Sequence, residues 1–163
     1  MGRANAHDLD WETVDHGTAG WRRKRLGRAA DGEALGCSLY ELPPGKRSWP
    51  YHYHAANEEA LYVLEGTGTL RTGDGETPVS AGDYVTFPAG ERGAHRVVNE
   101  SDEPLRYLLV STMVTPDVTV YPDSAKVGVF VGAAPGGAGE RSVNGFYRLE
   151  DEVGYWTGED DEA

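Results

Sequence analysis

Short apolar or alternating segments, each ended by a glycine or proline turn, follow one another through the middle of the chain. Leu35 to Leu42 alternates apolar and small residues and stops at a Pro-Pro-Gly sequence. Similar segments follow at 59–64, 66–72, 84–87, 95–99 and 105–113. Strands separated by turn signals at this spacing are typical of an all-β sandwich or barrel. No helical apolar period of convincing length interrupts them, so the sequence predicts an all-β fold.

Two histidines and a carboxylate lie in this predicted strand region. His52 and His54 are two residues apart. In a strand both imidazoles project to the same face, about 6.5–7 Å apart at a rise of ~3.3 Å per residue. Glu59 follows a short turn and is the first residue of a segment that can pair antiparallel with the strand of His52 and His54. These three side chains are therefore expected to converge, and His95 follows later in the chain.

The same residues resemble the two sequence motifs of a known family. His52-Tyr-His54, four residues, Glu59, six residues and Gly66 resemble the first motif of the cupins. The second motif is similar to the sequence formed by Gly82-Asp83, Pro88-Ala-Gly90, His95 and Asn99. The chain departs from the family pattern in two turns, which are each longer than usual, but the strand parity of the ligands is unchanged. The resemblance covers roughly residues 34–113.

Membership of the cupins implies a double-stranded β-helix, the cupin jelly-roll barrel, with a metal site inside it. The implied ligands are His52, His54, Glu59 and His95. Glu58 is the competitor of Glu59, but Glu59 shares strand parity with the apolar residues that follow and has the motif spacing to the next turn. Three imidazoles and one carboxylate suit Fe, Mn, Zn, Ni or Cu, and neither the sequence nor the resemblance identifies the ion. The lack of cysteine ligands argues against a purely structural zinc site, and four ligands leave coordination positions open for water, dioxygen or substrate.

The ends of the chain lie outside the resemblance. We expect an N-terminal arm over residues 1–30, a barrel core over 31–114 and an irregular extension over 115–163, whose acidic tail is predicted to be disordered. His7 and His16 in the arm have no ligand spacing and are not expected to bind the metal. The only basic run, residues 20–28, is expected to be a solvated strand face or an intersubunit salt link rather than an anion site.

Composition limits the partners of the protein. Acidic residues outnumber basic residues by 27 to 15, for a formal charge of −12, so phosphate-rich nucleic acid would be repelled. The acidic, lysine-poor composition suits adaptation to high salt, or alternatively an ordinary acidic protein from a GC-rich genome. The single cysteine, Cys37, excludes an internal disulfide. The sequence shows no signal peptide and no apolar run of ~20 residues, so a cytoplasmic protein without a membrane partner is expected.

Two classes of function fit these expectations. The first is a metal-dependent enzyme for a small polar metabolite, which resembles the sugar-phosphate isomerase cupins or the dioxygenase cupins, with lyases on the same scaffold as a third alternative. The second is a non-catalytic metal or small-ligand binding protein, such as a sensor. The resemblance also implies a homodimer. Weak candidates for catalytic residues are Tyr107 and Arg106, and weak candidates for substrate-binding residues are Lys46, Arg47 and Arg92. An apolar wall for dioxygen chemistry is expected from Leu61, Val63, Val97 and Leu109.

Overall fold

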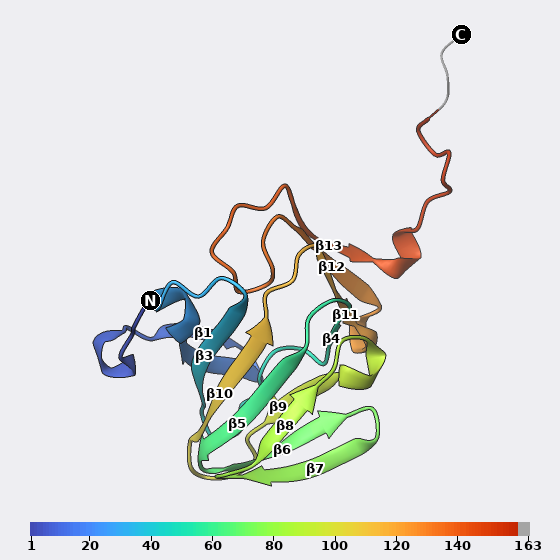
Figure 1. Ribbon diagram of the computed structural model, residues 1–163. Coiled ribbons are helices and arrows are strands. Elements are labelled where there is room, and N and C mark those ends of the chain that lie inside the picture. The colour runs from blue at the N-terminus through green and yellow to red at the C-terminus, as the bar shows by residue number, and fades with distance from the viewer. Residues whose placement is uncertain (160–163) are drawn as a thin grey trace.

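A computed structural model describes residues 1–159 and shows an almost entirely β structure (Figure 1). The strands are β1 (Glu12–His16), β2 (Ala19–Lys24), β3 (Leu35–Leu42), β4 (Tyr53–His54), β5 (Glu59–Glu65), β6 (Thr67–Thr72), β7 (Gly75–Ser80), β8 (Tyr84–Phe87), β9 (His95–Val98), β10 (Leu105–Thr112), β11 (Asp117–Tyr121), β12 (Lys126–Val131) and β13 (Val143–Arg148). The helical segments are short: α1 (Leu26–Ala29), η1 (Ala6–Asp8), η2 (Glu91–Gly93), η3 (Pro122–Ser124) and η4 (Leu149–Asp151). None of the helices within residues 1–159 has the length and apolar character needed to span a membrane.

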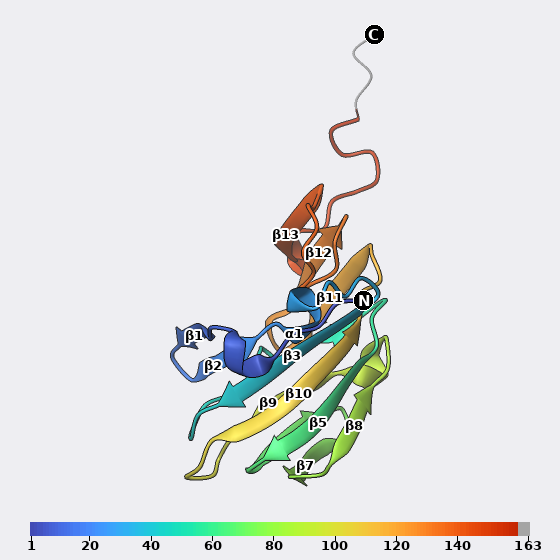
Figure 2. The ribbon, with the colours of Figure 1, turned by 60° about the vertical axis from the view of Figure 1, so that its left-hand side comes forward.

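The strands form three antiparallel sheets. The largest has the order β1-β2-β3-β10-β5-β8, and Figure 2 shows its central strands side by side. The other two have the orders β13-β12-β11-β4 and β7-β6-β9. Neighbours in the sheets are often distant in the sequence, as for β10, which lies between β3 and β5. This arrangement confirms the predicted jelly-roll barrel.

A compact apolar core holds the sheets together. It includes Leu42, Leu61, Val63, Leu105 and Tyr107, each 1% exposed or less. Alternation along β5 places Leu61 and Val63 inside, whereas Tyr62 and Leu64 face solvent at 42% and 44% exposure. The period of two that was read from the sequence therefore matches the burial of this strand.

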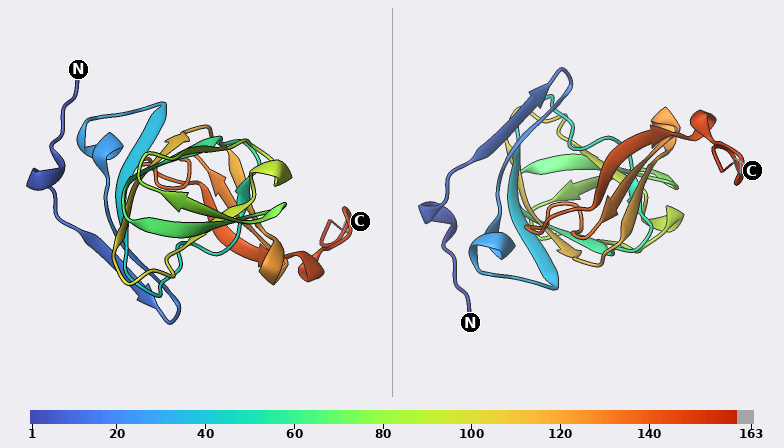
Figure 3. Two further views of the ribbon diagram at one scale, coloured as in Figure 1. Left: turned by 90° about the horizontal axis from the view of Figure 1, so that it is seen from below. Right: turned by 90° about the horizontal axis from the view of Figure 1, so that it is seen from above.

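The two ends of the chain add strands to the barrel on opposite sides (Figure 3). In the N-terminal segment, β1 and β2 form a hairpin that extends the large sheet at the edge of β3. The extension after residue 115 is more regular than predicted, because β11, β12 and β13 pair in sequence and β11 also pairs with β4. The expected disorder of the acidic tail concerns in part residues 160–163, which lie outside the described residues.

Truncation of a core leucine is expected to destabilise the barrel. Leu105 is fully buried, and its side chain packs closely against the backbone at Gly68. Leu105→Ala should lower the free energy of unfolding by about 2–5 kcal/mol, because a cavity is added to the lost burial. Leu64→Ala, at a 44% exposed position of β5, is the matched control and should change stability by less than about 1 kcal/mol. Urea denaturation measures both, and equal effects would contradict this description of the core.

Candidate metal centre

Main-chain pairing brings the two sequence motifs together. The backbones of His52 and His95 form a pair of antiparallel hydrogen bonds, with N–O distances of 3.2 Å and 2.9 Å. His54 lies on β4 opposite Thr119 of β11. Glu59 begins β5, between Phe87 of β8 and Ser111 of β10. Each of the four expected ligands is therefore placed by a sheet contact to a distant part of the chain.

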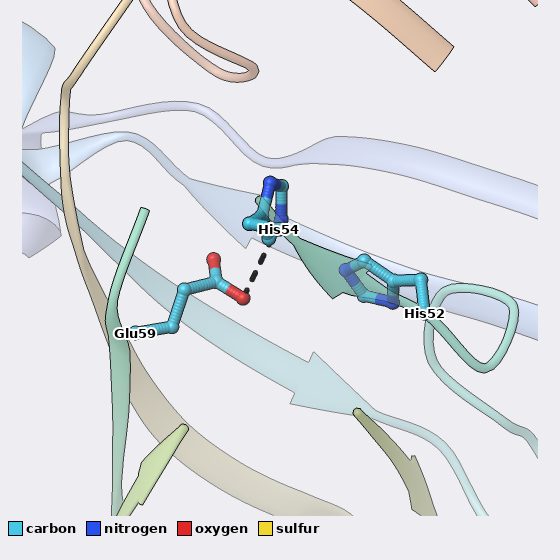
Figure 4. A group of neighbouring side chains, drawn as sticks. All are labelled: His52, His54 and Glu59. Atoms are coloured by element: carbon cyan, nitrogen blue, oxygen red, sulfur yellow. Dashed lines mark ion pairs between the residues drawn. The ribbon is translucent and has the colours of Figure 1, made fainter. Parts of the chain in front are cut away.

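The side chains of these residues converge. Ligand atoms of His52, His54 and Glu59 all lie within 4.8 Å of one another, and Figure 4 shows the three side chains around a common space. The Oε2 atom of Glu59 is 3.7 Å from Nε2 of His54 and 3.4 Å from Nε2 of His95. The ring of His95 also packs against Phe87, with centroids 3.7 Å apart. Glu58, the competing carboxylate, is exposed, so Glu59 is the glutamate that faces the histidines.

The three imidazoles are held in one orientation by their Nδ1 atoms. Each Nδ1 lies at hydrogen-bond distance from an acceptor: the carbonyl oxygen of Pro50 for His52 (2.8 Å), Oδ2 of Asp117 for His54 (2.6 Å) and the carbonyl oxygen of Gly93 for His95 (2.8 Å). A carbonyl or carboxylate oxygen requires Nδ1 to donate, which leaves the lone pair of a neutral ring on Nε2. Such outer hydrogen bonds are typical of metal-binding histidines.

The donor set fits a divalent transition metal. Oε2 of Glu59 is buried and has no hydrogen-bond partner within the described residues. A buried carboxylate oxygen without a partner is costly, and a cation placed between it and the Nε2 atoms would satisfy it. Because three imidazoles and a carboxylate also have the ligand chemistry of such ions, the residues present are consistent with a metal.

Burial and neighbouring charges shift the pKa values of the histidines in different directions. Burial, reinforced by the neighbouring His95 and His54, lowers the pKa of His52 well below its usual value, and burial also lowers the pKa of His95. Burial acts in the same direction on His54, but the hydrogen bond to Asp117 and the charge of Glu59 outweigh it and raise its pKa. Burial opposes ionisation of Asp117 as well, yet the hydrogen bond from His54 leads to a lowered pKa. His52 and His95 are therefore neutral at neutral pH, as metal ligation requires.

A cavity of about 650 Å³ opens beside His52, His54 and Glu59. Its wall is partly apolar, with Leu109, Met113 and Phe130, and partly polar, with Thr119 and Tyr121. Volumes of this size are typical of small-molecule sites (about 300–1,000 Å³). The cluster of His52, His54 and Glu59 is therefore accessible to a small molecule.

The weak candidates from the sequence lie elsewhere. Tyr107 is 1% exposed and stacks on Tyr40 inside the core. Arg106 forms ion pairs with Glu41 and Glu65, and Lys46 pairs with Asp15. Arg47 and Arg92 are exposed and, like the other three candidates, are not among the residues that line the cavity.

The apolar wall also differs from the expectation. Of the four residues expected to form it, only Leu109 lines the cavity, because Leu61, Val63 and Val97 are buried in the core. Strand parity predicted correctly that these side chains point inward. It does not distinguish the packed part of a barrel from its open end.

Sequence reasoning missed two groups of residues at the cavity. The basic run contributes Arg23, Arg25 and Arg28 to the wall, so these residues do not lie on a purely solvated face. Strand β11 contributes Thr119 and Tyr121, and its first residue contacts His54. Residues 117–121 were expected to belong to the irregular extension, although the alternating sequence Asp-Val-Thr-Val-Tyr carries the signal of a strand.

Comparison with known proteins agrees with this geometry. Residues 38–111 match the family model of the cupin domain. L-ectoine synthase from Mycolicibacterium gilvum (strain PYR-GCK) is 35% identical over 99 residues, which are 59% of this chain and 71% of the relative.

Two solved structures resemble almost the whole chain. A protein from Acidithiobacillus ferrooxidans ATCC 23270, provisionally assigned as a sugar phosphate isomerase, superposes with a TM-score of 0.77 at 29% identity, over 92% of this chain and 94% of that one. A sugar phosphate isomerase of the cupin superfamily from Silicibacter pomeroyi DSS-3 gives a TM-score of 0.75 at 28% identity, over 90% and 92% of the two chains. The matches in sequence and fold, together with the cluster of histidines and glutamate, show that this chain belongs to the cupin superfamily.

Proposed function

We propose that the protein is a metal-dependent enzyme that binds one divalent transition metal ion and acts on a small anionic metabolite in the adjoining cavity. The proposed ligands are His52, His54, Glu59 and His95. The observation that carries the proposal is the buried Oε2 atom of Glu59, which has no hydrogen-bond partner among residues 1–159 and faces the Nε2 atoms of His54 and His95. The cavity beside these residues provides the space for a substrate.

An isomerase of phosphorylated sugars is the reaction class that we favour. When bound, the ion would act as a Lewis acid and polarise a substrate carbonyl. The arginines on the cavity wall suit an anionic substrate in a protein that is otherwise strongly acidic. The two solved structures described above, which carry the sugar phosphate isomerase assignment, support the same class.

We propose that Tyr121 contacts the substrate. Its ring stacks on His52 with centroids 5.9 Å apart, and it lines the cavity. Burial and the nearby charge of Asp117 raise its pKa to about 12, so the phenol stays protonated at neutral pH. We propose that its hydroxyl donates a hydrogen bond to a substrate oxygen and helps to orient it beside the metal ligands.

Oxygenase chemistry is the second candidate. Leu109, Met113 and Phe130 make one part of the cavity wall apolar, as a site for dioxygen beside a metal would require. Oxygen consumption by the iron-loaded protein with an organic substrate would favour this candidate over an isomerase.

A direct experiment tests for metal-dependent turnover. The metal-loaded protein is incubated with a panel of aldose and ketose phosphates, and interconversion is followed by NMR. We expect turnover that disappears on chelation and returns when the ion is restored. Turnover that persists undiminished without metal would disprove the catalytic role of the ion. Ligand binding without any conversion would instead identify the protein as a binding cupin.

Substitution of a ligand should abolish tight metal binding. We expect the wild-type protein to bind one divalent ion at neutral pH. His52→Ala and Glu59→Gln should each weaken the metal affinity by at least about a hundredfold, because loss of a ligand should cost at least as much as loss of a residue that only hydrogen-bonds to a ligand. His16→Ala is the control, because His16 is exposed at the end of β1 and should leave the affinity unchanged. Isothermal titration calorimetry with Ni²⁺ and Zn²⁺ measures the affinities. Equal binding by all four proteins would rule out these ligands.

Asp117 should support metal binding through His54. Asp117→Asn removes the charge that fixes His54 by a 2.6 Å contact but keeps the shape of the side chain. We expect the metal affinity to fall by about 10–100-fold while one ion still binds. The matched control is Asp123→Asn in the neighbouring η3, where the carboxylate pairs with Arg71 and does not contact a proposed ligand. If Asp117→Asn bound the ion as tightly as this control, Asp117 would have no role in orienting His54.

A further inference from the structure

We propose that arginines from outside the matched cupin domain form an anion-binding subsite for the phosphate or carboxylate group of the substrate. They are Arg23, Arg25 and Arg28 from the N-terminal segment and Arg141 from the loop after β12. All four line the same cavity as His52, His54 and Glu59. The inference rests on the proposed function in one respect, since it assumes that one substrate reaches both the arginines and the metal ligands.

Arg23 is held rigidly in the cavity wall. Its side chain is only 15% exposed, and its Nε donates to Glu12 while its Nη1 donates to the hydroxyl of Tyr40. The guanidinium also lies 5.6 Å from the ring centroid of Trp49. A cation fixed in this way loses little conformational freedom when it binds an anion.

Arg25 joins the two segments that form this part of the wall. Its Nε donates to both carboxylate oxygens of Glu12, and its Nη1 donates to the carbonyl oxygen of Gly136. Gly136 belongs to the glycine-rich loop that also lines the cavity. The hydrogen bond therefore holds the N-terminal segment against that loop. As a result, the arginines of both segments line the same cavity.

Arg141 approaches from the opposite end of the same loop. Its Nε and Nη2 donate to the carbonyl oxygens of Ala133 and Ala134, and its guanidinium lies 5.3 Å from the ring centroid of Phe130. These contacts are all with neutral groups. The charge of Arg141 is thus not neutralised by a carboxylate within residues 1–159.

Of the four arginines, Arg28 has the fewest competing contacts among the described residues. It lies at the end of α1, is exposed at the cavity mouth and forms no ion pair or side-chain hydrogen bond with any described residue. A guanidinium presents paired N–H groups that match the oxygens of phosphate and carboxylate. It is therefore suited to contact an anion without first breaking an existing contact.

The charge balance favours an anion at this wall. The four arginines share this region with four acidic residues: Asp31, Glu33 and Glu59, which also line the cavity, and Glu12, which pairs with Arg23 and Arg25. If Glu59 binds the metal ion, the four arginines and the other three acidic residues together have a net charge of +1. In a chain with a net charge of −12, this is a local reversal of sign. A cavity of about 650 Å³ leaves room for a small metabolite that reaches from the metal ligands to the arginines.

The subsite is tested with inorganic phosphate as the probe. Phosphate is titrated into the metal-loaded full-length protein at low ionic strength and followed by calorimetry. We expect saturable binding, and Arg28→Gln and Arg141→Gln should each weaken it by about tenfold through the loss of a charged hydrogen bond. Arg148→Gln is the control, because Arg148 is 72% exposed, pairs with Glu150 and does not line the cavity. Acetate, titrated in parallel, shows whether the subsite prefers a phosphate or a carboxylate.

Three outcomes would overturn the proposal. Absence of saturable binding of either anion to protein that holds its metal would exclude the subsite but leave the metal site intact. Equal weakening by Arg148→Gln would show only a general effect of charge. Loss of phosphate binding in folded His52→Ala, as checked by circular dichroism, would place the anion on the metal rather than on the arginines. Phosphate binding by His52→Ala that is weakened further by Arg28→Gln would support the subsite even if the metal has no catalytic role.

Discussion

The antiparallel main-chain pair between His52 and His95 is the contact on which the candidate site depends. It joins the two motifs of the barrel, and the other proposed ligands are fixed by equally regular pairings, His54 to β11 and Glu59 to β8 and β10. The backbone pairing fixes where each side chain leaves the sheet, and the Nδ1 hydrogen bonds of the three histidines then hold the orientation of the rings. The site is therefore a direct consequence of the sheet register.

Segments outside the common barrel give this cavity its character. The barrel core supplies the histidines and the glutamate, but the arginines come from the β1–β2 hairpin and α1, and from the loop after β12. Strand β11 provides both the carboxylate that orients His54 and the tyrosine beside His52. Because the fold supports many reactions, the choice of substrate is expected to reside in these added segments rather than in the metal ligands.

The barrel and the four converging side chains were predictable because they depend on local signals. A period of two, turn residues and a His-x-His pair determine which side chains share a strand face, as β5 illustrates. The cavity wall was not predictable in the same way. The roles of Arg23 and Arg28 depend on how the N-terminal hairpin docks against β3 and on where the glycine-rich loop lies, and no local pattern encodes either contact. Strand β11 was not predicted, although the sequence of residues 117–121 alternates recognisably.

We propose above all that Glu59 and three histidine Nε2 atoms surround a single metal ion. X-ray absorption spectroscopy of the protein loaded with one equivalent of Zn²⁺ or Ni²⁺ tests this most directly, because the multiple-scattering features of imidazole report the number of histidine ligands. We expect three imidazole nitrogens and at least one carboxylate oxygen at distances of about 2.0–2.2 Å when zinc is bound. A bound ion surrounded only by oxygen ligands, or a purified protein that retains no divalent ion near neutral pH, would contradict it.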